Sequence, residues 1–125
     1  MDIEIKTNLG RSALDRCVRV VLGFWPQAVI DDGDTGERYH DVGDVPLETT
    51  TEVLVYRDDD FAAKWDELGA EPEIENTMVH LLYDPGYINV VVGNPDDDEM
   101  RPLLAEIYTA LEANTSAISR ERSIT

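Results

Sequence analysis

The sequence predicts an α+β domain: a largely antiparallel sheet of about five or six strands with three helices, in the order β-α-β-β-β-α-β-β-α. Two β-rich runs, residues 77–83 and 87–92, flank a turn sequence. Apolar residues recur with helical spacing near both ends of the chain, which predicts amphipathic helices. Several predicted strands follow one another directly, with no helix between them. This order favours an antiparallel sheet with helices packed on it.

The two β-rich runs form the predicted central hairpin. Asp84, Pro85 and Gly86 separate them, and Pro-Gly favours a chain reversal because proline presets φ and glycine accepts positive φ. Both faces of each run are largely apolar, so we expect central strands that are covered on both sides. His80 alternates with Met78 and Leu82 and is therefore expected to be a core or interface histidine.

The chain begins with an alternating strand over residues 2–6, followed by a helix with N-cap candidates at residues 7–8 and at Ser12. Gly23 and Pro26 end this helix. A strand remains an alternative around residues 18–21, because three of these residues are valines. The helical stripe comprises Leu14, Cys17, Val18, Val21 and Leu22.

The middle of the chain predicts three strands and a short helix. Residues 27–30 and 37–42 are strand candidates joined by an Asp-Gly-containing turn, and residues 49–57 form a stronger strand. Residues 58–60 are three aspartates that suit a helix N-terminus, and Gly69 ends that helix. Its expected apolar face comprises Phe61, Ala62, Trp65 and Leu68.

The last predicted helix begins near Asp98, which places Pro102 in its first turn, where proline is tolerated. Asn114 is its expected end, so the predicted domain spans residues 1–114. Residues 115–125 are mostly polar and aperiodic, which predicts a flexible C-terminal tail. The stripe of this helix comprises Leu103, Leu104, Ile107, Tyr108 and Leu111.

The charge of the chain is strongly negative, because 27 acidic residues and 10 basic residues give a net charge of −17. Such a surface repels nucleic acid and anionic membranes, so neither is an expected partner. It favours a basic protein or cations. Lys6 and Lys64 are the only lysines, and an aspartate-rich, lysine-poor surface is also expected of a protein adapted to a salty cytoplasm.

The negative charge is concentrated in residues 31–60, where eleven acidic and two basic residues give a net charge of −9. Tyrosines beside carboxylates suit a protein-binding patch, although a solvated face explains the same pattern. No metal site is expected, because an EF-hand starting at Asp32 would place Gly43 where a glutamate is required. The candidate partner-binding residues are Asp31, Asp32, Asp34, Tyr39, His40, Asp41, Asp44, Asp58 and Asp59.

Catalytic residues and cofactor sites are not predicted. Cys17 lies on an apolar helical stripe, which favours a buried thiol over a nucleophile. One cysteine and two histidines make a zinc site improbable, and no glycine-rich phosphate-binding motif is present. No apolar run is long enough for a membrane span, and the N-terminus resembles a strand rather than a signal peptide, so we expect a cytoplasmic protein.

The sequence therefore favours a small non-enzymatic binding protein that docks a basic partner through residues 31–60, for example a neutralising, immunity-type protein. One alternative is an oligomeric accessory protein whose acidity is only adaptation to salt. Another is a small-ligand or hydrolytic enzyme with a pocket near His80, Tyr83 and Tyr87 in the central hairpin.

Overall fold

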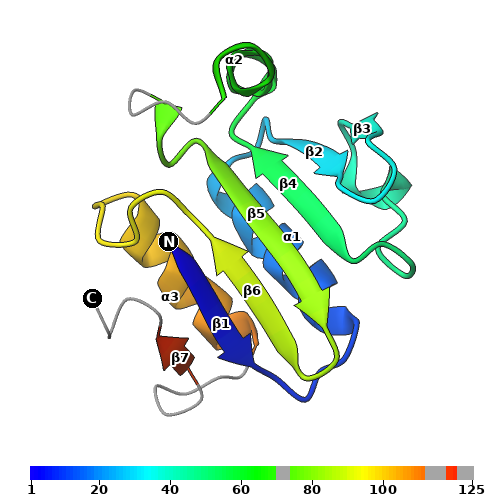
Figure 1. The fold of residues 1–125 in the computed structure, drawn as a ribbon, viewed down its shortest axis with the longest axis vertical. Coiled ribbons are helices and arrows are strands. Elements are labelled where there is room, and N and C mark those ends of the chain that lie inside the picture. Colours follow the sequence, from blue (N-terminus) through cyan, green and yellow to red (C-terminus); the bar gives the residue numbers. More distant parts are fainter. Residues whose placement is uncertain (70–73, 112–117, 121–125) are drawn as a thin grey trace.

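The computed structural model describes residues 1–69, 74–111 and 118–120, which form one antiparallel sheet and three α-helices (Figure 1). The strands lie in the order β3-β2-β4-β5-β6-β1-β7, and the α+β class and the predicted order of elements are confirmed. The elements are β1 (Asp2–Lys6), α1 (Ser12–Phe24), β2 (Val29–Asp32), β3 (Arg38–Tyr39), the 3₁₀ turn η1 (Val42–Asp44), β4 (Glu52–Tyr56), α2 (Asp59–Leu68), β5 (Met78–Asp84), β6 (Tyr87–Val91), α3 (Met100–Ala110) and β7 (Ile118–Arg120).

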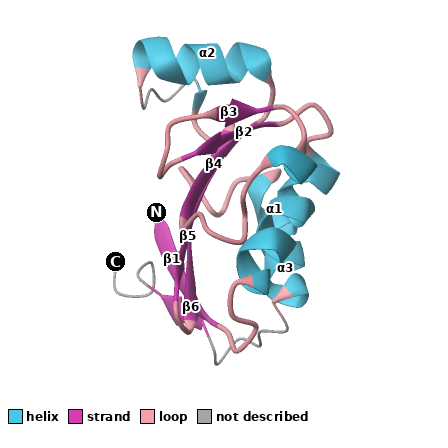
Figure 2. Cartoon of the chain, turned by 90° about the vertical axis from the view of Figure 1, so that its right-hand side faces the viewer, coloured by secondary structure: helices cyan, strands magenta, loops and turns pink. Residues whose placement is uncertain are grey.

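Two helices cover one face of the sheet. Figure 2 shows α1 and α3 side by side on the same face, whereas α2 lies across one end of the sheet. The main core lies between the sheet and these two helices, and every second strand residue points into it. The strand residues that face α1 and α3 and are fully or almost fully buried are Ile3, Ile5, Ile30, Val53, Val55, Val79, Leu81, Ile88 and Val90.

The central hairpin forms as predicted. Asp84 pairs with Tyr87, so Pro85 and Gly86 alone make the turn. Gly86 has φ +90°, a conformation that side chains with a Cβ rarely adopt. The hairpin lies in the middle of the sheet, with β4 on one side and β1 on the other.

The helical stripe of α1 is confirmed, and the strand alternative for residues 18–21 is wrong. Leu14, Cys17, Val18 and Val21 are all fully buried. The burial of Cys17 raises the pKa of its thiol to about 12, so the thiol stays protonated and is a poor nucleophile. The helix begins at Ser12 rather than near residues 7–8. Its N-cap is Arg11, which makes no side-chain capping hydrogen bond, so the expectation of an N-cap at Ser12 is wrong.

The other two helices have the predicted N-terminal features. The Asp58 carboxylate accepts a hydrogen bond from the Phe61 N–H, which caps α2. Pro102 lies in the first turn of α3, where its missing N–H breaks no helical bond. Leu68 is 45% exposed, so the buried face of α2 is narrower than expected. The predicted end of the last helix at residue 114 lies outside the described residues.

Three expectations need correction. Among the described residues, only one face of the hairpin is fully covered: α1 and α3 lie on that face, and on the other face α2 reaches Met78 only. The strands predicted at residues 27–30 and 37–42 are β2, shifted towards Asp32, and β3, only two residues long. Residues 118–120 of the predicted tail form β7, which pairs with β1.

Candidate functional site

The acidic residues 31–60 run through β2, β3, η1 and β4 to the start of α2, along one edge of the sheet (Figure 1). Most of the candidate partner-binding residues in this segment have hydrogen-bond partners within the chain. Their roles separate into loop stabilisation, ion pairing and helix capping.

Asp32 stabilises a loop and is only 1% exposed. Its Oδ1 accepts hydrogen bonds from the N–H groups of Asp34 and Thr35 and from the hydroxyl of Thr50. Its Oδ2 has no hydrogen-bond partner among the described residues. A side chain this deeply buried cannot contact a partner protein, so Asp32 stabilises the loop and is not part of a contact surface.

Asp34 is tied to the start of β4. The Thr51 N–H donates to its Oδ2 over 2.8 Å, and the Thr51 hydroxyl donates to its Oδ1 over 3.0 Å. These hydrogen bonds, the backbone one first, lower the pKa of Asp34 below its ordinary value. The Asp34 carboxylate therefore holds the β2–β3 loop against the chain that leads into β4.

Asp31 forms an ion pair with Arg38 of the neighbouring strand. Nε and Nη2 of Arg38 donate to the two Asp31 oxygens over 2.6 Å and 2.9 Å, and Arg38 also reaches Asp66 of α2. These bonds, above all the one to Asp31, raise the pKa of Arg38 above its ordinary value. The guanidinium also lies over the ring of Tyr56, so it joins β3, β4 and α2.

The remaining candidates also make local contacts. Asp41 accepts from the Gly43 N–H and caps η1, as Asp58 caps α2. His40 Nε2 lies 2.7 Å from Asp59 Oδ1, with both side chains largely exposed. The Tyr39 hydroxyl donates to Glu37, and this hydrogen bond raises the pKa of Tyr39.

Six exposed carboxylates of the segment have no cation within ion-pair distance among the described residues. Asp34, Glu37 and Asp41 accept hydrogen bonds instead, whereas Asp44, Glu48 and Asp60 have neither kind of partner. Of these last three, only Asp44 belongs to the set singled out from the sequence. The carboxylates of this edge that have no partner among the described residues therefore lie at η1, in the loop that follows it and in the first turn of α2.

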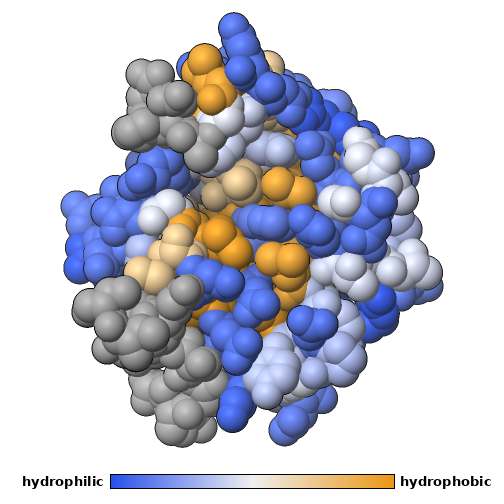
Figure 3. Space-filling view, in the orientation of Figure 1, coloured by the Kyte–Doolittle hydropathy of each residue, from blue (hydrophilic) through white to orange (hydrophobic). Residues whose placement is uncertain are grey.

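A second surface was not predicted: the face of the sheet opposite α1 and α3, which we call the open face. Its side chains alternate with the buried ones along each strand, and the strand register brings them together. Figure 3 views this face and shows an apolar centre surrounded by hydrophilic residues. Among the described residues, the open face comprises Asp2, Glu4, Lys6, Val29, Asp31, Arg38, Glu52, Leu54, Tyr56, Met78, His80, Leu82, Asp84, Tyr87, Asn89 and Val91.

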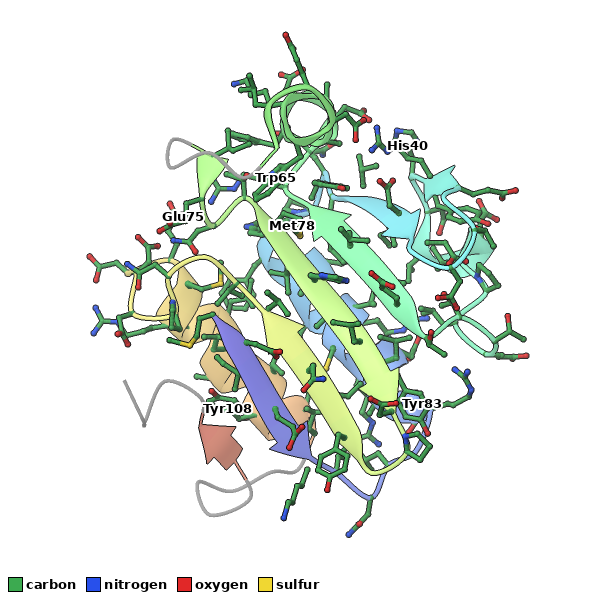
Figure 4. All side chains as sticks on the ribbon, in the orientation of Figure 1. His40, Trp65, Glu75, Met78, Tyr83 and Tyr108 are labelled. Carbon is green, nitrogen blue, oxygen red and sulfur yellow. The ribbon has the colours of Figure 1, made fainter. Side chains whose placement is uncertain are left out.

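The apolar centre has two parts. At one end α2 packs on the sheet, where Trp65 and Met78 contact a small second core that contains Tyr56. Figure 4 shows Trp65 of α2 next to Met78 of β5. Beyond the reach of α2, Leu82 and Val91 are partly exposed and belong to neither core cluster. Leu82 and Val91 are therefore apolar side chains of the open face that no described element fully covers.

One hydrogen-bonded pair of polar side chains lies beside these apolar residues. His80 Nε2 is 2.7 Å from Glu52 Oε1, and the two side chains are 24% and 33% exposed. Leu54 lies directly opposite His80 on β4, and Leu82 lies directly opposite Glu52 on β5. His80 was expected to be a core or interface histidine. It is hydrogen-bonded to Glu52 and lies on the open face, outside the main core.

The open face had a signal in the sequence. Except for His80, the residues of segment 78–83 are apolar at both the odd and the even positions. This pattern indicates that both faces of β5 favour burial. That pattern does not show whether the covering layer belongs to the same chain.

Two cavities lie away from the central hairpin. One, of about 610 Å³, is lined by residues that include Trp25, Arg57 and Glu99. The other, of about 690 Å³, lies between the start of α1 and residues 42–49. Neither is lined by His80, Tyr83 or Tyr87, where an enzyme pocket was considered. Within residues 1–69, 74–111 and 118–120, no three His, Cys, Asp or Glu side chains are grouped to hold a metal ion.

Comparison of the chain with protein-family models, with curated proteins and with solved structures found no match. Among the described residues, no helix has the length and apolar character needed to cross a membrane.

Proposed function

We propose that this chain is a binding protein that docks a basic protein partner. The observation that carries the proposal is the combination, on the open face, of an apolar centre with a carboxylate-rich surround. An apolar centre and a polar rim are the usual anatomy of a protein contact surface.

The charge supports a partner of opposite sign. The open face carries five carboxylates and two cations, and one of these cations, Arg38, is already paired with Asp31 and Asp66. At the adjoining edge, Asp44, Glu48 and Asp60 add charge with no cation partner among the described residues. Complementary charge speeds encounter and suppresses wrong partners. Inhibition of the partner, as by an immunity-type protein, is one form of this proposal.

Self-assembly is a second candidate, because the partly exposed Leu82 and Val91 would also suit a second copy of the chain. Two copies docked through their open faces would bring two net-negative surfaces together, on chains that each carry a net charge of −17. Charge therefore favours the basic partner over the second copy, most strongly at low salt.

The test is retention of a partner from an extract of the source cells on the immobilised chain. The variant Asp44→Asn/Glu48→Gln/Asp60→Asn removes three unpaired carboxylates. The matched control Glu67→Gln/Glu75→Gln/Glu106→Gln removes three exposed carboxylates elsewhere.

We expect a protein with an excess of Lys and Arg to be held by the wild type and by the control. It should elute at lower chloride from the first variant, because that variant lacks charge near the contact. The proposal is contradicted if the wild type retains no basic protein. It is also contradicted if the retained protein elutes at the same chloride concentration from both variants.

A further inference from the structure

We infer that the open face binds an amphipathic helix of a partner protein, with an apolar stripe flanked by Lys and Arg. This inference rests on the proposed function and names the element that the partner contributes. Three observations carry it: the apolar side chains without full cover, the way in which α2 covers one end of the open face, and the charges around them.

Among the described residues, the apolar side chains without full cover, Leu82 and Val91, lie on adjacent strands, and Leu54 on the next strand also contacts the core beneath α2. Strand register places Leu54, His80 and Val91 side by side on β4, β5 and β6, and Leu82 lies in the next row. The apolar face of a sheet is stable when another layer covers it. On the opposite face, α1 and α3 supply that layer from the same chain.

A helix already packs on this face. The apolar side of α2 places Ala62 and Trp65 against Val29, Tyr56 and Met78, and the Trp65 indole N–H donates to Thr77. The rest of the face, towards Leu82 and Val91, continues the surface on which α2 rests. A second helix beside α2, with its apolar stripe on the sheet, would complete the layer.

The charged residues around the apolar centre determine which charge the partner should carry. Asp2 and Glu4 flank the apolar centre on the β1 side, and Asp84 lies at the turn of the hairpin. Lys6 and Arg38 are the cations on this face, and Arg38 is committed to Asp31 and Asp66. A helix with Lys or Arg beside its apolar stripe would meet this rim with complementary charge, whereas an acidic helix or a second copy would be repelled.

The test uses two designed helical peptides with the same leucine stripe, one flanked by lysines and the other by glutamates. Fluorescence anisotropy measures their binding to the whole chain at low chloride and at about 0.5 M chloride, where exposed charges are strongly screened. Leu82→Lys changes the open face. Phe24→Lys is the matched control, because Phe24 is also an apolar surface residue, 40% exposed, at the end of α1 in the helical layer.

We expect the lysine peptide to bind the wild type at least about tenfold more tightly than the glutamate peptide at low chloride. Leu82→Lys should lower the affinity for the lysine peptide by about tenfold or more, as loss of a central contact does. Phe24→Lys should change that affinity by less than about twofold. Both substitutions change the net charge equally, so the difference reports the position of the contact.

Circular dichroism checks that both variants fold. If Leu82→Lys unfolds the chain, the variant Glu4→Gln/Asp84→Asn replaces it. This variant should bind the lysine peptide more weakly than the wild type does, and it should bind the glutamate peptide at least as tightly.

Several results would overturn the inference. They are no binding of the lysine peptide to the wild type, equal binding of the two peptides, or equal effects of Leu82→Lys and Phe24→Lys. A dimer that Leu82→Lys dissociates would identify a second copy as the occupant. In a further outcome, the immobilised chain retains a basic protein from the cell extract while Leu82→Lys leaves the binding of the lysine peptide unchanged. That combination would support the proposed function and reject only the open face as the contact surface.

Discussion

His80 Nε2 lies 2.7 Å from Glu52 Oε1, across the β4–β5 boundary of the open face. The pair lies beside Leu54 and Leu82, and both of its side chains retain contact with solvent. It therefore adds a polar contact to an apolar surface without the full cost of burying charge.

The first prediction concerns this pair. In a double-mutant cycle of His80→Ala and Glu52→Ala, we expect a coupling free energy of about 0.2–1 kcal/mol, the range for partly exposed pairs. Urea unfolding of the four proteins at one pH gives this value. Zero coupling would show that the two side chains do not interact in solution.

The cap of α2 is a second test. Asp58→Ala removes the acceptor for the Phe61 N–H and should lower the free energy of unfolding by about 0.5–2 kcal/mol. Asp58→Ser keeps a capping oxygen and should recover most of that loss. Equal destabilisation by the two substitutions, measured by urea unfolding, would assign the effect to something other than the cap.

Asp34 predicts a pH dependence. Hydrogen bonds from Thr51, first its backbone N–H, lower the pKa of Asp34 in the folded chain below the ordinary value of 3.8. The stability that these bonds supply is therefore present above that ordinary value and is lost as pH falls through the lower folded pKa. Below pH 4, unfolding midpoints should fall less steeply for Asp34→Asn than for the wild type. Parallel profiles would contradict the assignment.

Burial of α3 is the fourth prediction. Ile107 is fully buried between the helix and the sheet, so Ile107→Ala should cost about 2–5 kcal/mol in the free energy of unfolding. The exposed neighbour Glu106 is the control, and Glu106→Ala should change it by less than about 0.5 kcal/mol. A loss below about 1 kcal/mol for Ile107→Ala would show that α3 does not pack as described.

Local sequence patterns predicted most of the fold. The Pro85-Gly86 turn, the stripe of α1 and the position of Pro102 are each decided within a few residues, by backbone geometry or by helical periodicity. The short β3 was overestimated, because its length depends on pairing with β2 over only two residues. Such pairing is a tertiary property that the local pattern does not contain.

The candidate site was harder to predict for two reasons. The roles of the acidic residues depend on register and loop geometry: Asp31 meets Arg38 across a strand pair, and Asp32 turns inward to meet Thr50. The open face was missed because alternating apolar residues predict burial but do not say which chain supplies the cover. The sequence thus indicated where the charge lies, and the fold showed which carboxylates have no cation partner among the described residues.

The most direct test of the account is thermal unfolding across a chloride series, with light scattering to follow association. The central claim is that the negative surface serves a partner. It predicts a monomer that unfolds cooperatively even at about 10 mM chloride, where the Debye length is about 30 Å and repulsion within the chain is strongest. A chain that folds only at molar chloride would contradict the claim, because its acidity would then be an adaptation to salt.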